Sequence, residues 1–454
     1  MKFRGGLAAA ALVLFGGSVG PAAAAGTPDI AGTWKGALTR NGRPWTVRFG
    51  SWHTPDGLRV CFDFPDYGLY YRCTSDVSVT EGLTLIRYTS GRDVVTLEGT
   101  LDSSRYVGHW KGLGVDADFQ LERSGPAGAP LAEEDVRFRN GDVELAGTLV
   151  RPAAPGRYAA VVWTHGSGDQ SRATDFYRDR AYLLAENGLA AFIYDKRGVG
   201  KSGGDRESTL DELAGDAVAA VQCLQGRADI DSNAVGVGGF SQGGFVAPLA
   251  AARYGRIAFV VTGATPGVTP AELNDFAART ALVRRGFSAD VIERAMSLRR
   301  EVLHAQETGE ELPKLERTLS AARSEPWFDA ADLPRSPVQP YGSRGLSVLH
   351  FDPVPVWERV AVPVLAVWGA DDALVPVERS RRAVEAGLRV ARNPNVTTRV
   401  FPNAGHGLAE TGRAGVWDWP RLAPGFHDFM MQWVLARLPA RGAAMSSARG
   451  ASGS

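Results

Sequence analysis

The residue types needed for nucleophilic acyl transfer occur here in an order typical of one mechanism. Gly239-Phe-Ser241-Gln-Gly243 is a G-x-S-x-G segment, in which a sharp turn after a strand exposes the serine and the flanking glycines avoid clashes. A serine hydroxyl becomes a nucleophile only with a base in hydrogen-bonding reach. His406 follows the last predicted strand and is the candidate base. The sequence therefore predicts Ser241 as nucleophile.

The base needs a carboxylate that holds its tautomer and stabilises the imidazolium. Asp371 and Asp372 both follow the penultimate predicted strand, and by position either could serve. The chain order of serine, Asp372 and His406 is the order found in α/β-hydrolases. We assign no catalytic role to the histidines of the N-terminal segment, the predicted helices or the insertion, which are His53, His109, His304, His350 and His427.

Residues 135–438 resemble the α/β-hydrolase superfamily, especially bacterial esterases and the serine aminopeptidase and monoglyceride-lipase-like branch. In those proteins the acid lies in a Gly-x-x-Asp-x-x-Val-Pro pattern, which implies Asp372 rather than Asp371. The family's His-Gly-x-Gly loop matches His165-Gly-Ser167-Gly168. The resemblance implies an oxyanion hole formed by the backbone amides of Ser167 and Gln242, with His165 orienting the loop.

Residues 194–202 match a further loop of this family, Asp-x-Arg-Gly-x-Gly-x-Ser. We expect Asp195 and Arg197 to form an ion pair that fixes loops near the site. Gly200-Lys-Ser202 looks like the end of a P-loop, but Asp195 stands where the first glycine would be, so no nucleotide site is expected. No Cys, His and Asp cluster has metal-ligand spacing, and we expect neither a metal nor an organic cofactor.

Strands and helices alternate through residues 135–438, which predicts a mostly parallel sheet in an α/β fold. A hairpin at 136–145 leads into it, and Thr209 and Glu212 can form a capping box for a helix over 210–224. Pro248 is tolerable only near the first turn of the helix after Ser241. An excess of residues at about 264–350 predicts a helical cap over the carboxyl ends of the strands. The apolar runs that predict strands are 159–163, 190–194, 234–237, 257–261, 364–368 and 397–401.

Residues 28–123 show the short alternating runs of a small all-β, barrel-like domain. Matching Gly-x-Trp-Lys-Gly segments at 32–36 and 108–112 predict that the first strand lies beside the last. This part resembles the lipocalin-like β modules that precede some bacterial hydrolase domains. Residues 124–134, rich in Gly, Pro and Ala, are expected to be a linker.

The chain ends carry signals of processing. Lys2 and Arg4, a short apolar run and small residues before position 26 indicate a signal peptide at 1–25, and therefore an exported protein. Residues 439–454 are predicted to be disordered. In an oxidising compartment Cys61 and Cys73, which flank a predicted hairpin, could form a disulfide or remain two thiols, whereas Cys223 is expected to be a small apolar helix residue.

Composition excludes several partner classes. Fifty basic residues balance 50 acidic ones, so nothing points to nucleic acid. No run after the signal peptide is long enough for a stable membrane span, and the sequence indicates no oligomeric state.

The expected function is hydrolysis of a small-molecule carboxylic ester through an acyl-serine intermediate. A peptidase or amidase of the same fold is the alternative, because amide cleavage uses the same triad. An aminopeptidase would need acids to bind a free amine, for which Glu272, Asp275 or Asp290 are candidates. A second alternative is an inert hydrolase domain whose β domain binds a ligand.

Overall fold

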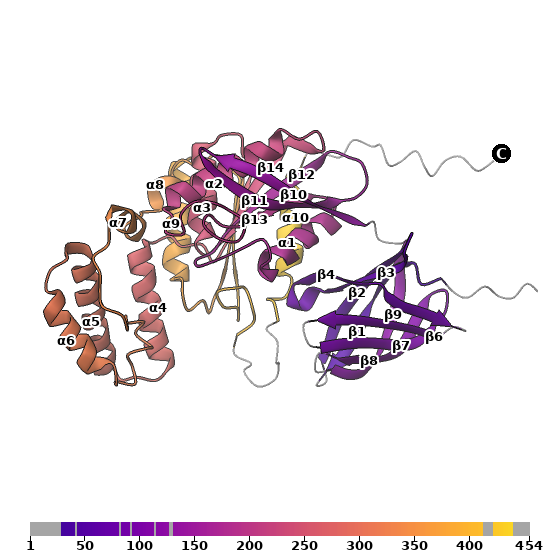
Figure 1. Ribbon diagram of the computed structural model, residues 1–454, viewed down its shortest axis with the longest axis horizontal. Coiled ribbons are helices and arrows are strands. Elements are labelled where there is room, and N and C mark those ends of the chain that lie inside the picture. Colours follow the sequence, from indigo (N-terminus) through magenta and orange to yellow (C-terminus); the bar gives the residue numbers. More distant parts are fainter. Residues whose placement is uncertain are drawn as a thin grey trace, which may run out of the picture.

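The computed structural model describes residues 29–40, 43–80, 83–90, 93–112, 115–126, 130–411 and 421–438, and Figure 1 shows their arrangement. The expected signal peptide and the expected disordered tail lie outside the described residues. Within the described ranges, no helix has the length and apolarity needed to cross a membrane. The chain forms an N-terminal antiparallel β domain followed by an α/β domain.

The β domain is one nine-stranded sheet in the order β4-β3-β2-β1-β9-β8-β7-β6-β5. β1 pairs with both β2 and β9, so the prediction that the first strand lies beside the last is confirmed, although the second Trp segment lies in β8. The strands are β1 (Gly32–Arg40), β2 (Arg43–Thr54), β3 (Gly57–Phe64), β4 (Leu69–Thr74), β5 (Asp76–Thr80), β6 (Leu83–Ser90), β7 (Asp93–Leu101), β8 (Arg105–Gly112) and β9 (Val115–Gly125).

Aromatic side chains form much of the core of the β domain. Trp34 stacks on Phe49, and Tyr106 meets both rings edge-on. The Tyr106 hydroxyl donates at 3.2 Å to the backbone carbonyls of Thr84 in β6 and Leu97 in β7, which satisfies its buried oxygen. On the β3–β4 ladder, Cys61 lies opposite Cys73 and the two form a disulfide.

The α/β domain has an eight-stranded sheet in the order β10-β11-β13-β12-β14-β15-β16-β17. The β10–β11 hairpin is antiparallel, and β12 to β17 run parallel. β10 begins at Leu131, so the last four residues of the expected linker belong to the sheet instead. The strands are β10 (Leu131–Asn140), β11 (Val143–Pro152), β12 (Tyr158–Thr164), β13 (Ala190–Tyr194), β14 (Ile230–Phe240), β15 (Val260–Gly263), β16 (Val364–Gly369) and β17 (Val396–Phe401).

Helices cover both faces of this sheet. One apolar cluster packs the sheet against α2 (Leu210–Gln225), α3 (Gly243–Arg253), α8 (Val354–Trp357) and α9 (Val377–Val390). A second packs it against α1 (Asp175–Glu186) and α10 (Phe426–Leu435).

Of two predictions about these helices, one is confirmed and one is wrong. Thr209 and Glu212 form the predicted capping box, which fixes the start of α2. The prediction for Pro248 is wrong, because this residue lies inside α3, beyond the first turn. Its missing N–H removes the hydrogen bond that position 248 would otherwise donate to the Gly244 carbonyl, a cost that the extensive burial of α3 must offset.

The insertion between β15 and β16 contains the predicted cap helices. α4 (Pro270–Arg284), α5 (Ala289–Thr308) and α6 (Leu312–Ala322) form a group at one end of the molecule, and α7 (Ser343–Leu349) connects them to the α/β domain (Figure 1). Their apolar residues, with the segment around Phe328, make a separate small core.

The β domain packs against α1 through β4, Tyr70 of β4 contacts α10, and Asp66 of the short 3-10 helix η1 (Pro65–Tyr67) accepts from the Leu422 amide before α10. Tyr70 is buried in the α/β domain's own apolar cluster, and its hydroxyl is hydrogen-bonded to His427 Nδ1 at 3.0 Å. The Tyr70 amide and the Arg72 guanidinium both contact the Asp179 carboxylate, each at 2.9 Å. The two domains therefore share buried apolar and polar contacts.

Candidate active site

Ser241 occupies a strained turn between β14 and α3. Its φ of 56° is unusual for a residue with a side chain, and its amide donates to the Gly263 carbonyl of β15 at 3.0 Å. The flanking glycines are required by close approach. A Cβ at Gly239 would lie 2.2 Å from the Gly243 carbonyl oxygen, and one at Gly243 would lie 2.9 Å from Thr164 Oγ1. The backbone thus has the geometry of a nucleophile elbow.

His406 lies in the loop after β17 and is held by Asp372. Its Nδ1 donates to the Asp372 carboxylate, at 2.9 Å to Oδ2 and 3.1 Å to Oδ1. The Asp372 side chain is fully buried, and its Oδ1 accepts from the amides of Leu374 (2.8 Å) and Val375 (3.0 Å). A carboxylate fixed in this way sets the tautomer of the ring and leaves His406 Nε2 as the proton acceptor.

Asp371, the other acid that fits by position, has different contacts. Its carboxylate accepts from the Thr411 hydroxyl, and its carbonyl accepts from the Arg284 guanidinium of the cap at 2.7 Å. Of the two aspartates, Asp372 is the one that contacts His406.

The sheet topology brings the three candidate residues to the carboxyl end of the parallel strands. β14, β15, β16 and β17 are parallel neighbours, so the segments after them emerge at the same end of the sheet. Ser241 follows β14, Asp372 follows β16 and His406 follows β17. Within the described part of the chain the Ser241 hydroxyl makes no hydrogen bond with His406; such contacts are often long before substrate binds.

The loop after β12 carries His165 and Ser167. His165 is buried, and its Nε2 donates to the Tyr194 carbonyl at 2.6 Å. Burial lowers the pKa of His165 to about 3, so the ring stays neutral and acts by orienting the loop. The neighbouring Gly166 amide is occupied, because it donates to the Tyr177 hydroxyl at 2.7 Å.

The two expected oxyanion donors differ from Gly166. Among the residues that the structure describes, the backbone amides of Ser167 and Gln242 have no hydrogen-bond acceptor. Two unoccupied amides, one on the loop after β12 and one directly after the elbow serine, are the arrangement that can stabilise an oxyanion.

The expected ion pair between Asp195 and Arg197 is wrong. Arg197 forms a buried pair with Asp216 of α2, with Nε 3.0 Å from Oδ2. Asp195 instead accepts from the amides of Arg172 (3.1 Å) and Lys201 (2.9 Å), and Arg172 Nε lies 3.6 Å from its carboxylate. Neighbouring residues on a turn leave the chain in different directions, so each charge has its own distant partner.

Lys196 received no role from the sequence. Its ammonium is buried and donates to three acceptors, the carbonyls of Gly166 (3.0 Å) and Gly168 (3.2 Å) and Gln242 Oε1 (2.7 Å). The only signal for it is its place in the matched loop, between Asp195 and Arg197.

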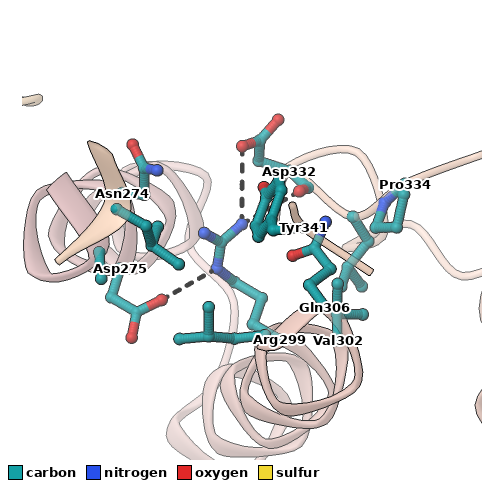
Figure 2. A pocket seen from close by; sticks show the side chains of 12 residues that line it. Asn274, Asp275, Arg299, Val302, Gln306, Asp332, Pro334 and Tyr341 are labelled. Carbon is teal, nitrogen blue, oxygen red and sulfur yellow. Dashed lines mark hydrogen bonds and ion pairs between the residues drawn. The ribbon is translucent and has the colours of Figure 1, made fainter. Parts of the chain in front are cut away.

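A pocket of about 290 Å³ lies in the cap, between α4, α5 and residues 332–349. Figure 2 shows Arg299 at its centre, between Asp275 and Asp332. Its Nε lies 3.3 Å from Asp275 Oδ1, and its Nη1 lies 3.6 Å from Asp332 Oδ2. None of the residues that line it belongs to the Ser241, Asp372 and His406 group. No group of three or more His, Cys, Asp or Glu side chains among the described residues is placed to hold a metal ion.

The acids considered for binding a free amine are engaged or exposed. Glu272 closes the capping box of α4 and pairs with Arg379 of α9. Asp275 pairs with Arg299, and Asp290 is an exposed residue in the first turn of α5.

Two solved structures are similar to part of this chain. An esterase from Pyrococcus furiosus is 20% identical with a TM-score of 0.44, over 68% of this chain and 92% of that chain. A dienelactone hydrolase from Anabaena variabilis is 18% identical with a TM-score of 0.40, over 68% and 99% of the two chains. No curated protein sequence matches significantly. Residues 161–419, more than half of the chain and including Ser241, Asp372 and His406, match the alpha/beta hydrolase family. The protein therefore belongs to the alpha/beta hydrolase family.

Proposed function

We propose that this hydrolase cleaves carboxylic esters of small molecules through an acyl-Ser241 intermediate. The observation that carries the proposal is the contact of His406 with buried Asp372, at the sheet edge where the strained elbow presents Ser241. A base with a fixed tautomer and a serine on a strained turn, both at the carboxyl end of one parallel sheet, are the groups that nucleophilic acyl transfer needs.

The proposed reaction has two steps. His406 Nε2 takes the Ser241 proton as the hydroxyl oxygen attacks the ester carbonyl carbon, and the oxyanion accepts from the amides of Ser167 and Gln242. The intermediate collapses as His406 returns the proton to the departing alcohol. Water then gives a proton to the same ring and attacks the acyl-serine, and His406 returns that proton to Ser241 Oγ as the acid is released, while Asp372 stabilises the imidazolium in both steps.

Esters are favoured over peptides by the surroundings of the cap acids. A free amine would have to displace Arg379 from Glu272 or Arg299 from Asp275. A ligand-binding role for the β domain has little support either, because Trp34, Phe49 and Tyr106 pack against one another in its interior.

The test compares ester turnover by the wild type, Ser241→Ala and the control Ser208→Ala, which removes the hydroxyl of a loop serine that contacts Asp205. With p-nitrophenyl esters of several chain lengths, Ser241→Ala should lose at least about 10⁴-fold in kcat, and the control should not change. A fluorophosphonate probe should label the wild type at Ser241 alone. Turnover that survives in Ser241→Ala would exclude this nucleophile.

A further inference from the structure

Lys196 contacts both parts of the proposed oxyanion hole. It is the second residue after β13, and its side chain reaches the loop after β12 on one side and the first residue after Ser241 on the other. Three acceptors at 2.7–3.2 Å match the three protons of an ammonium group. Its side chain therefore joins two loops that are far apart in the sequence.

The contact with Gly166 bears directly on the Ser167 amide. The Gly166 carbonyl and the Ser167 N–H belong to the same peptide group, and no described peptide bond is cis. In a planar trans peptide these two groups point in opposite directions, so an ammonium bound to the oxygen fixes the direction of the N–H. A positive charge on the carbonyl side also polarises the peptide and strengthens its N–H as a donor.

The carbonyl groups next to the Ser167 amide in this loop already have hydrogen-bond donors. The Ser167 carbonyl accepts from Gln170 Nε2 at 3.2 Å, and the Gly168 carbonyl accepts from the Gln170 amide at 3.1 Å as well as from Lys196. The Lys196 amide itself donates to the Gln170 carbonyl at 3.1 Å. Backbone and side chain of Lys196 thus both hold the loop.

We infer that Lys196 is a positioning residue for the oxyanion hole, which aligns the Ser167 amide through the Gly166 carbonyl and ties it to Gln242 after the nucleophile. This inference rests on the proposed function. Lys196 acts through the two amides and need not touch the substrate.

The charge of Lys196 should make the reaction sensitive to alkaline pH. Burial lowers the pKa of Lys196 to about 8, and Asp169 on the facing loop opposes this shift. The other titratable group that faces Lys196 is His165, which is neutral. The chain neighbours of Lys196 are paired elsewhere, Asp195 with Arg172 and Arg197 with Asp216. The ammonium is present below about pH 8 and lost above it, so kcat should fall as pH rises through this value.

The experiment compares Lys196→Met with the matched control Lys201→Met, an exposed lysine of the same loop whose side chain has no hydrogen bond or ion pair in the described structure. Because a lost oxyanion donor costs about 10²–10³-fold, a misaligned one should lower kcat by about 10–100-fold with KM within about threefold. Inhibition by a trifluoromethyl ketone, whose hemiketal oxygen occupies the same hole, should weaken to a similar extent.

Three outcomes separate the hypotheses. The wild type should show a loss of kcat near pH 8 that Lys196→Met lacks, which a purely structural role would not produce; the wild-type profile serves as the test if the variant does not fold. Wild-type kcat, inhibition and pH profile in a folded Lys196→Met would overturn the inference, while fluorophosphonate labelling of Ser241 would still support the proposed function. An unlabelled wild-type protein would overturn both.

Discussion

Asp371 and Asp372 are the same residue type at adjacent positions, and their surroundings give them different chemistry. Asp372 is buried, accepts from two loop amides and contacts His406. Asp371 contacts Thr411 and, through its carbonyl, the cap residue Arg284. Two loop amides hold the Asp372 carboxylate in place, and this should make it a fixed partner for the imidazolium that forms during the reaction.

This pair gives a sharp test of the acid. Asp372→Asn keeps the shape of the side chain but favours the wrong tautomer of His406, so kcat should fall by about 10⁴-fold with little change in KM. Asp371→Asn should change kcat by less than about threefold, because its side chain does not contact the ring. Steady-state kinetics on one ester measure both. Equal losses in the two variants would contradict the assignment of Asp372.

The sequence predicts the candidate catalytic residues, but not the side-chain contacts that hold the loops around them. The segment around Ser241 and the position of His406 after the last strand can be found because strand order and turn chemistry are local properties. The partners of Asp195 and Arg197 cannot, since Arg172 and Asp216 reach them through tertiary packing. Lys196 was missed for the same reason: its three acceptors lie on two other segments.

At the scale of elements, two helices begin with the same device and link the cap to the α/β domain. Glu212 closes the capping box of α2 and also pairs with Arg344 of cap helix α7 at 2.7 Å. Glu272 closes the capping box of cap helix α4 and also pairs with Arg379 of α9. Each glutamate therefore both caps a helix and forms an ion pair between the cap and the α/β domain. Glu212 belongs to the α/β domain, and Glu272 belongs to the cap.

The capping box of α2 can be tested by its effect on stability. Thr209→Ala removes the acceptor of the Glu212 amide and should lower the free energy of unfolding by about 1 kcal/mol. Thr209→Ser keeps the hydroxyl and should lie within about 0.5 kcal/mol of the wild type. Urea denaturation followed by circular dichroism measures both. An alanine variant as stable as the serine variant would show that the cap contributes nothing.

Element types were predictable where one local signal dominated. β13 spans the predicted residues, and Thr209 marks the start of α2. The strand predicted at 257–261 begins instead at Val260, although Ala258 already donates to the Val235 carbonyl of β14 at 2.8 Å. The helical character of the cap follows from composition, but its separate core depends on which faces meet, and periodicity does not contain that information.

At the scale of the molecule, the β domain contributes to the core of the α/β domain. Tyr70 is almost fully buried there, beside His427, whose pKa burial holds well below its usual value. His427 Nε2 has no partner among the described residues, so the Tyr70 hydroxyl provides the one hydrogen bond of this ring. Sequence patterns separated the two domains but did not predict this interface, because its partners are more than a hundred residues apart.

Removing that hydroxyl tests the coupling of the domains. Tyr70→Phe leaves His427 Nδ1 buried without a partner and should lower the free energy of unfolding by about 1–3 kcal/mol, with ester turnover unchanged. Tyr88→Phe removes a hydroxyl of the same domain that makes no hydrogen bond with described residues, and should be neutral. Calorimetry on the full chain measures the difference. Equal stability of the two variants would mean that the hydrogen bond between Tyr70 and His427 does not contribute to the free energy of unfolding.

The pairing of β1 with β9 also determines how the β domain responds to mechanical load. Because the chain enters at β1 and leaves at β9, tension between these ends acts on one end of a single antiparallel ladder, where Thr33 faces Gly125. Backbone bonds would then open one pair at a time. Arg123 closes that end: it donates to the carbonyls of Asp29 and Ala31 at 2.6 and 2.5 Å, and it lies over the Trp34 ring. Together with the Thr33 hydroxyl, which donates to the Pro126 carbonyl at 2.6 Å, this arginine should matter more to the force that opens the domain than the length of the sheet.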